Sequence, residues 1–356
     1  MDYQGLIDKY EKERDLDDAE FEALLSNEDD FPSEYLDFKA RKARERAYGK
    51  GVYLRGLIEF TNHCRNNCYY CGIRCGNKKV KRYRLSEEQI LSISESGYRK
   101  GLRTFVLQGG EDAFFTDDRL VSIIAKVREA CPDAAITLSI GERSRKSYER
   151  LYGAGANRFL LRHETADRAH YEALHPKEMS YEHRMDCLKD LKKIGYQVGC
   201  GMMVGSPGQS SRELIRDLHF IRDFKPHMVG IGPFIPHHDT PFASCPSGSV
   251  DMTLRLLAII RLLLPKVLLP ATTALRTLDP KGYEKGLLAG ANVIMINLTP
   301  PEARIKYSLY DGKGLSQMVP KEMEGDEVGL LLDEIKKKVQ STGYIVSLER
   351  GDYKNS

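Results

Sequence analysis

Residues 61–71 hold the most informative stretch of the chain: Thr61-Asn62-His63-Cys64-Arg65-Asn66-Asn67-Cys68-Tyr69-Tyr70-Cys71. Its three cysteines have the spacing C-x3-C-x2-C, with an aromatic residue before the last one. Three thiolates this close can bind three irons of a [4Fe–4S] cluster and leave the fourth iron open. An electron-transfer cluster of this type uses a fourth cysteine. The spacing therefore favours a cluster that binds an outside ligand and takes part in chemistry.

Two other uses of these cysteines are less favoured. A structural zinc site normally has four protein ligands, and the nearest further donor, His63, directly precedes Cys64. A disulfide framework is typical of short secreted chains. This chain has 356 residues and 8 cysteines, and its first residues lack the apolar core of a signal peptide.

The composition indicates one large folded body without a strongly charged partner. Hydrophobic residues make up 41% of the chain, charged residues 29%, and the net charge is +3. Basic residues gather between Arg74 and Arg84, where a solvated loop is favoured over a nucleic-acid site. The most apolar stretch, 254–270, is interrupted by charges and a proline, so it is unsuited to cross a bilayer. We expect a cytoplasmic protein, in a reducing compartment that keeps thiolates free, with neither nucleic acid nor membrane as a partner.

From residue 52 onward, short β-rich runs alternate with longer amphipathic segments. Strands are expected at residues 52–60, 104–108, 135–140, 158–162, 197–204, 228–232, 267–273 and 292–297. Helices are expected between them at residues 86–99, 117–130, 144–152, 180–194, 210–224, 251–264 and 281–288. This alternation indicates parallel strands joined by crossover helices. Eight such strands predict an α/β fold, a closed (β/α)8 barrel of the TIM type.

Turn signals support this barrel. Ala154-Gly155-Ala156-Asn157 and Ala289-Gly290-Ala291-Asn292 form a weak internal repeat, each between an expected helix and an expected strand, and Gly195 has the same place before another strand. A glycine just past a helix allows the left-handed turn back to the sheet. Serine and glutamine in Ser86-Glu87-Glu88-Gln89 have the spacing of a capping box.

We predict three parts of the chain. An N-terminal helical extension covers residues 1–50, the barrel covers 51–300, and a C-terminal segment, 301–356, packs on the barrel with a helix at 327–339.

Barrels of this type carry their active sites at the carboxyl ends of the strands. Polar residues follow the expected strands at Cys64, Gly109-Gly110-Glu111-Asp112, Arg162-His163-Glu164, Gly205-Ser206-Pro207-Gly208 and Thr272-Thr273. We therefore expect these groups to meet at one end of the barrel.

Three longer segments carry a narrower signal: Arg162-His163-Glu164-Thr165, Gly232-Pro233-Phe234-Ile235-Pro236-His237 and Pro270-Ala271-Thr272-Thr273-Ala274. With the cysteine motif, they make the chain resemble the radical S-adenosylmethionine (SAM) enzymes and, among these, the HydE family of [FeFe]-hydrogenase maturases. The resemblance extends over nearly the whole chain.

The resemblance implies one [4Fe–4S] cluster on Cys64, Cys68 and Cys71, whose open iron binds the amine and carboxylate of SAM. Gly109-Gly110-Glu111 would contact the methionyl amine, through a carboxylate beside a cation. Taken alone, this tripeptide would be an ordinary turn between a strand and a helix about as often as it would be a SAM contact.

Further SAM contacts are implied by the same resemblance. Glu164 and Arg184 would contact the ribose and the methionyl carboxylate, and the other expected contacts are Tyr70, Ser139 and Met203. Outside this family, Arg184 would be a solvated helix arginine and Met203 an ordinary core residue.

The resemblance also implies the reaction. SAM would be cleaved reductively to an adenosyl radical that attacks a small iron complex carrying cysteine, carbon monoxide and cyanide, in assembly of the hydrogenase di-iron subcluster. The residues expected to bind this substrate are Arg162, Thr272, Thr273, Tyr307 and Tyr310. An arginine with two hydroxyls can hold an anionic ligand. Expected partners are the other hydrogenase maturases and a reduced flavodoxin or ferredoxin.

Other functions stay open on the same scaffold: a methylornithine synthase, an enzyme of the iron-guanylylpyridinol cofactor, or a cluster carrier without radical chemistry. Some HydE proteins have an auxiliary cluster on cysteines near the carboxyl end, but no cysteine follows Cys245 here. We therefore expect no second cluster. Cys75, close to the motif, is either a spare thiol or a loop residue, and Cys131, Cys187, Cys200 and Cys245 are expected to be buried structural thiols.

Overall fold

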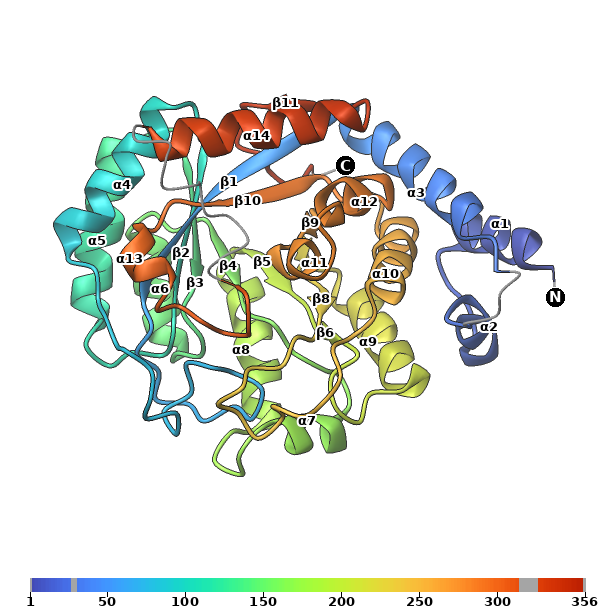
Figure 1. Cartoon of the computed structure of the whole chain (residues 1–356), viewed down its shortest axis with the longest axis horizontal. Coiled ribbons are helices and arrows are strands. Elements are labelled where there is room, and N and C mark those ends of the chain that lie inside the picture. The colour runs from blue at the N-terminus through green and yellow to red at the C-terminus, as the bar shows by residue number, and fades with distance from the viewer. Residues whose placement is uncertain (1, 27–30, 314–325, 355–356) are drawn as a thin grey trace.

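A computed structural model describes residues 2–26, 31–313 and 326–354 of the chain (Figure 1). Within these ranges, eight parallel strands form a barrel in the order β7-β5-β4-β3-β2-β1-β10-β9. Their bounds are β1 (Gly51–Thr61), β2 (Thr104–Gly109), β3 (Ala135–Ser139), β4 (Arg158–Leu160), β5 (Gln197–Cys200), β7 (Met228–Val229), β9 (Pro270–Ala271) and β10 (Val293–Asn297). The predicted (β/α)8 barrel is confirmed.

The ring closes between β7 and β9 through a single parallel bridge. Leu268, two residues before β9, pairs with Met228. Its amide donates to the carbonyl of His227 at 3.0 Å, and its carbonyl accepts from Val229 at 3.1 Å. The barrel is therefore nearly closed, with its shortest strands at this seam.

Helices cover the outside of the barrel in the connections between strands (Figure 1). They are α4 (Glu87–Arg99), α5 (Asp117–Ala130), α6 (Arg145–Gly153), α7 (Arg168–Leu174), α8 (Tyr181–Ile194), α9 (Ser211–Phe224), α10 (Val250–Leu263), α11 (Thr273–Leu278), α12 (Gly282–Leu288) and α13 (Pro301–Arg304). Local signals set several of their ends. The hydroxyl of Ser86 accepts from the amide of Gln89, whose side chain accepts from the amide of Ser86, so the expected capping box begins α4. Gly195 ends α8 with φ of 109°.

The internal repeat has a physical basis that its glycines alone did not reveal. Arg128 on α5 donates to the carbonyl of Gly155 and to the side-chain oxygen of Asn157. Arg261 on α10 makes the same two contacts with Gly290 and Asn292. Each asparagine oxygen also accepts from an amide of the preceding strand region, at Ile136 and Leu269. The same arginine–asparagine arrangement thus stabilises both helix-to-strand turns.

Four expected strands are clearly shorter than predicted: the runs 158–162 and 228–232 keep only β4 and β7, and two others differ more. The run 197–204 breaks after β5, and Met203–Val204 (β6) pairs instead with Gly232–Pro233 (β8) in a separate two-stranded sheet. The run 267–273 ends at Ala271, because Thr272 is the N-cap of α11 and Thr273 its first residue. The predicted strand end at Thr273 was therefore wrong.

The helices α1 (Tyr3–Glu13), α2 (Asp18–Leu24) and α3 (Ser33–Tyr48) lie on one side of the barrel, where α1 and α3 pack against α10 and α2 packs against α9 (Figure 1). The hydroxyl of Tyr10 donates to the carbonyl of Ile259 on α10 at 3.3 Å. Arg41 donates to the carbonyl of Leu288. The expected division at residues 50 and 300 stays a prediction, and parts of the two outer segments (1, 27–30, 314–325 and 355–356) lie outside the described residues.

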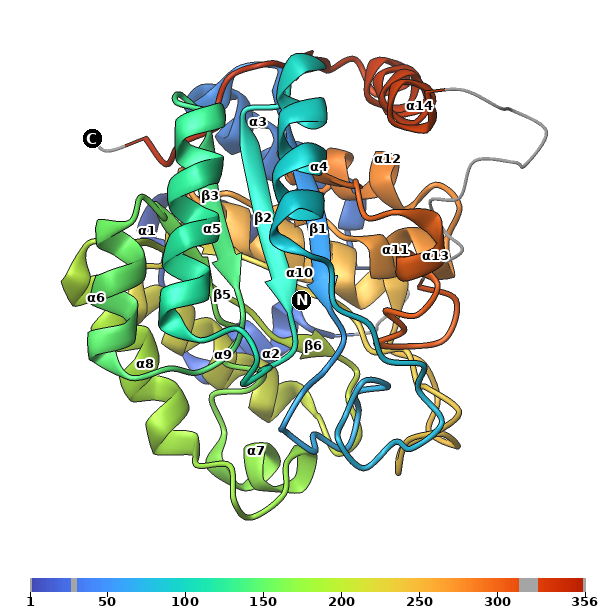
Figure 2. The same cartoon turned by 90° about the vertical axis from the view of Figure 1, so that its left-hand side faces the viewer.

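The C-terminal elements lie at the end of the barrel where its strands begin. Helix α14 (Glu327–Ser341) precedes β11 (Ile345–Ser347), which pairs in parallel with the start of β1. Figure 2 shows α14 at this end, whereas the loop that follows β1 lies at the opposite end. None of the described helices is long and apolar enough to cross a membrane.

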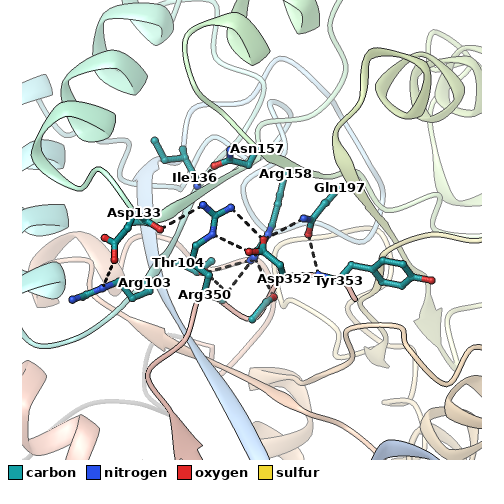
Figure 3. Close-up of polar contacts among 12 residues, drawn as sticks. Arg103, Thr104, Asp133, Ile136, Asn157, Arg158, Gln197, Arg350, Asp352 and Tyr353 are labelled. Atoms are coloured by element: carbon teal, nitrogen blue, oxygen red, sulfur yellow. Dashed lines mark hydrogen bonds and ion pairs between the residues drawn. The ribbon is translucent and has the colours of Figure 1, made fainter. Parts of the chain in front are cut away.

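Residues 350–353 lie at the end of the barrel where the strands begin, around Arg158, a fully buried residue of β4 (Figure 3). The Arg158 guanidinium donates to the carboxylate of Asp352 at 2.7 Å and to the carbonyls of Arg350 and Gly351, both at 3.1 Å. Gln197 also donates to Asp352. The sequence predicted only that the segment 301–356 packs on the barrel, and these contacts around Arg158 were not foreseen.

Candidate active site

Every residue expected to hold the cluster, SAM or the substrate lines one cavity of about 360 Å³ at the carboxyl ends of the strands. From the cysteine motif and the SAM contacts these are Cys64, Cys68, Cys71, Tyr70, Gly109, Gly110, Glu111, Ser139, Glu164, Arg184 and Met203. From the expected substrate contacts they are Arg162, Thr272, Thr273, Tyr307 and Tyr310. The structure thus brings all of them together, although their roles stay predictions. The turn Gly205-Ser206-Pro207-Gly208, also expected to meet these groups, does not line this cavity, and the hydroxyl of Ser206 lies 3.3 Å from the ring of His170 instead.

The cysteine loop, residues 62–86, joins β1 to α4 and carries the three thiols of the motif. Cys64, Cys68 and Cys71 are free and partly accessible. Gly110, at the end of β2, packs directly on this loop: a Cβ there would lie 2.6 Å from the Cβ of Cys64 and 2.3 Å from the carbonyl oxygen of His63. The loop and the strand end thus touch with no room for a side chain at residue 110, while the three cysteines line the adjoining cavity, so the donor set fits a cluster held by three cysteines.

Burial raises the pKa of all three thiols. For Cys71 the neighbouring Cys64 adds to the effect and the pKa reaches about 12, and for Cys68 it lies well above its usual range. Thiolates are the ligands that iron needs, so binding must release protons. The raised pKa values therefore leave the three thiols protonated in the absence of a cluster.

Two arginines of the cysteine loop make hydrogen bonds within the protein that the sequence did not predict. Arg82 donates to the carbonyls of Ile73 and Arg74, at 2.7 and 2.8 Å. Arg84 makes a paired contact with Asp112 at 2.6 and 2.9 Å. Arg84 is exposed, as a solvated loop predicts, whereas Arg82 is only partly exposed; both arginines also stabilise the loop through these bonds.

Glu111 is held between this loop and the next strand end. Arg65 donates to one carboxylate oxygen of Glu111 at 2.9 Å, and the amide of Glu142 donates to the other at 2.7 Å. Gly141 lies against this side chain with φ of +75°, where a Cβ would clash with it. The carboxylate is therefore fixed in the cavity wall.

Arg184 projects from α8 into the cavity and is buried. Its Nε pairs with the carboxylate of Glu142, and its Nη1 donates to the carbonyl oxygen of Arg162 at 2.7 Å. Burial alone would lower the pKa of Arg184, but the charge of Glu142 raises it well above its usual range. A solvated helix arginine is excluded, and a permanent cation faces the cavity.

Tyr70 is held by a histidine that sequence reasoning missed. The Nδ1 of His175 lies 2.9 Å from the carbonyl of Tyr171, to which it donates, so its Nε2 accepts from the hydroxyl of Tyr70 at 3.1 Å. Burial lowers the pKa of His175 to about 3. The histidine is thus neutral, and the Tyr70 ring is fixed beside the thiols.

The expected substrate side holds buried polar atoms that are not paired within the described chain. The hydroxyl of Thr272 and the Nε of Arg162 have no hydrogen-bond partner among these residues. Tyr307, also buried, accepts from the side chain of Gln108 at 3.3 Å. Unpaired buried donors are costly, so they mark a place for an anionic or polar ligand.

Sequence reasoning missed other residues of this cavity. Arg55 on β1, Thr137 on β3 and Lys313 line it as well. Alternate residues of a barrel strand point inward, so the period of two along the expected strands would have placed Arg55 and Leu57 inside. No local signal marks Lys313, which ion-pairs with the buried Glu59 far away in sequence.

Two further groups of potential metal ligands occur in the described chain. One is Glu142, His183 and Cys187, and the other is His237, His238 and Asp239. The Glu142 carboxylate already neutralises Arg184, and His238 pairs with Asp311 at 2.7 Å. Their existing partners account for both groups.

The comparisons with known proteins agree with this site. The sequence pattern of the Radical SAM superfamily matches residues 58–221, which include the cysteine loop. Fold and site together define a radical SAM enzyme. The "[FeFe] hydrogenase maturase subunit HydE" of Thermotoga maritima is 44% identical over 313 residues, covering 88% of this chain and 89% of that protein. The chain therefore belongs to the HydE family of the radical SAM superfamily.

A second group of relatives shares the scaffold. A 3-methylornithine synthase of Methanosarcina acetivorans is 31% identical over 82% of each chain. The crystal structure of a methylornithine synthase has a TM-score of 0.82 and 26% identity, and covers 96% of this chain and 97% of that one. Membership of the superfamily implies a [4Fe–4S] cluster and SAM, and the motif of Cys64, Cys68 and Cys71 is consistent with both.

Proposed function

We propose that this protein acts in the maturation of [FeFe]-hydrogenase, as a radical SAM enzyme whose substrate is a small iron complex carrying cysteine, carbon monoxide and cyanide. The observation that carries the proposal is the meeting of the three cysteines with Arg162 and Thr272 in one cavity. The identity with the HydE relative supports the pathway.

The proposed division of labour follows from the geometry. Cys64, Cys68 and Cys71 would hold the [4Fe–4S] cluster, which supplies the electron for reductive cleavage of SAM when both are bound. Glu111 and Arg184, of opposite charge, suit the methionyl amine and carboxylate. Tyr70, Ser139, Glu164 and Met203 would complete the SAM side.

The charges of the cavity favour an anionic substrate. Its charged lining comprises Arg55, Arg162, Arg184 and Lys313 with Glu111 and Glu164. Arg184 and Lys313 are paired with Glu142 and Glu59, whereas Arg55 and Arg162 keep buried nitrogens that have no hydrogen-bond partner among the described residues. A cyanide-bearing iron complex with a cysteine carboxylate would accept hydrogen bonds from Arg162 and from the hydroxyls of Thr272 and Thr273, with Tyr307 and Tyr310 closing the cavity. A methylornithine synthase would instead have to hold the two ammonium groups of lysine beside these cations.

The partners follow from the same proposal. The product would pass to the other hydrogenase maturases, and a reduced flavodoxin or ferredoxin would supply electrons, in the reducing cytoplasm.

An anaerobic assay tests the function. Protein reconstituted with iron and sulfide is given SAM and a strong reductant, with the synthetic iron–cysteine complex, with lysine, or with neither. We expect 5′-deoxyadenosine formation that the iron complex stimulates and lysine does not. Stimulation by lysine with formation of methylornithine would favour the rival reaction, and absence of 5′-deoxyadenosine would contradict radical SAM chemistry.

A further inference from the structure

The turn after β4 carries the site residues Arg162 and Glu164 and holds Glu164 in an unfavourable backbone conformation. Glu164 has φ of +67°, the left-handed region that residues with a Cβ avoid. Such a conformation persists only where the surroundings hold it. The question is therefore which groups hold this turn.

His163, between the two site residues Arg162 and Glu164, is fully buried and uses both ring nitrogens. Its Nδ1 accepts from the amide of Gly201 at 3.2 Å. In the neutral ring the other nitrogen then carries the proton, and it donates to the carboxylate of Asp217 at 3.1 Å. The carbonyl of the same Gly201 accepts from the amide of Glu164 at 3.0 Å. The amide and the carbonyl of Gly201, just after β5, are thus bonded to His163 and Glu164, respectively.

Asp217 closes this arrangement from α9. It is fully buried, and its Oδ1 accepts both from His163 and from the amide of Ala166, at 2.5 Å. The Oδ1 of Asp217 therefore joins His163, which precedes Glu164, to Ala166, which follows it. Phe220, one turn further along α9, packs on the His163 ring with centroids 4.6 Å apart.

We propose that His163 and Asp217 are positioning residues: the buried pair holds the turn 162–166 so that Glu164 and Arg162 present their side chains to the cavity. The Glu164 carboxylate lies 3.2 Å from the Arg162 guanidinium there. The inference rests on the proposed function, because it assumes that Glu164 contacts SAM.

Two substitutions at Asp217 separate position from charge. In Asp217→Asn the amide oxygen can still accept from both His163 and Ala166, whereas Asp217→Ala removes both bonds. We expect Asp217→Asn to bind SAM within about threefold of the wild type, and Asp217→Ala to bind it about tenfold more weakly, the loss typical of one charge-assisted hydrogen bond. Calorimetric titration of SAM into the anaerobically reconstituted protein gives the Kd, and amide hydrogen exchange at residues 162–166 should accelerate in Asp217→Ala alone.

Asp217→Ala also lowers stability, so a milder variant is measured beside it. His163→Gln keeps a donor for Asp217 and loses the acceptor for the amide of Gly201. Its matched control is His227→Gln, since the Nδ1 of His227 accepts from the amide of Val198 at 3.0 Å, at the opposite end of β5. We expect about threefold or more loss of SAM affinity in His163→Gln, with unchanged iron content, and none in the control.

Two results would overturn the inference. If Glu164→Ala weakens SAM binding but Asp217→Ala and His163→Gln both keep the wild-type Kd, the pair does not position the turn, and the proposed function stands. If Glu164→Ala itself leaves the Kd unchanged, the proposed role of Glu164 fails together with the inference.

Discussion

The guanidinium of Arg184 donates a hydrogen bond of 2.7 Å to the carbonyl oxygen of Arg162. One buried cation on α8 thereby touches the backbone of the residue that is proposed to bind the substrate, just after β4. The same cation is neutralised by Glu142, whose own amide donates to Glu111. A chain of hydrogen bonds and one ion pair therefore joins Glu111 and Arg184, proposed for the methionyl amine and carboxylate, to Arg162, proposed for the substrate.

Arg184→Ala should weaken SAM binding by about tenfold to 100-fold, because a charge-assisted contact with a carboxylate is lost. It should also lower the free energy of unfolding by about 3 kcal/mol, since the nearly buried Glu142 loses its partner. SAM titration and chemical denaturation measure the two effects. Arg145→Ala, which removes an exposed arginine that pairs with Glu149, is the control and should change neither quantity measurably. Unchanged SAM affinity in Arg184→Ala would contradict the proposed contact.

Single substitution of Cys64, Cys68 or Cys71 by alanine should abolish stable cluster binding and 5′-deoxyadenosine formation, because the cluster is bound through three irons. Iron and sulfide analysis after anaerobic reconstitution, with the visible absorption spectrum, measures the loss. Cys75→Ala is the matched control on the same loop and should retain the cluster. Loss of iron in Cys75→Ala as well would place this fourth thiol among the ligands.

Thr272→Val should separate stability from function. The Thr272 hydroxyl is buried without a hydrogen-bond partner among the described residues. Its replacement by a methyl group should therefore leave the free energy of unfolding unchanged or raise it by at most about 1 kcal/mol. The KM for the iron–cysteine complex should nevertheless rise about tenfold, while SAM affinity stays the same. Equal KM values for the variant and the wild type would remove Thr272 from the proposed substrate site.

Much of this fold is encoded in short-range patterns. The amphipathic run 117–130 coincides with α5, and Ser86 begins α4 through the capping box that its sequence spacing predicted. Both depend on residues within one or two helical turns, where periodicity and caps act directly. The motif residues also met in one cavity, because the carboxyl ends of parallel strands lie at the same end of a barrel.

The features that sequence reasoning missed depend on contacts over long distances in the chain. His163 and Asp217 are 54 residues apart, and Glu59 and Lys313 are 254 residues apart. Neither partner has a local pattern that names the other. The misplaced end at Thr273 has a different cause: β-branched residues favour strands, yet the hydrogen bonds of α11 require this threonine in a helix.

The last prediction concerns the closure of the barrel around Arg158. Burial alone would raise the pKa of Asp352, but the hydrogen bond and charge of Arg158, with the charge of Arg350, lower it below its usual value. A carboxyl whose folded-state pKa is lowered adds stability above its unfolded pKa, near 3.8, and this stability is lost as the pH falls through the folded value. Asp352→Asn should therefore be less stable than the wild type at neutral pH, and the difference should begin to shrink as the pH falls below about 3.8 and vanish only below the lowered folded-state pKa. Because the Asp352 side chain is 41% exposed, the difference should be only about 1 kcal/mol. Denaturation curves at pH 7, 5 and 3.5 measure it, with Glu349→Gln, an exposed neighbour in the same tail, as the control. A constant difference at all three pH values would show that Asp352 acts through shape rather than through its charge.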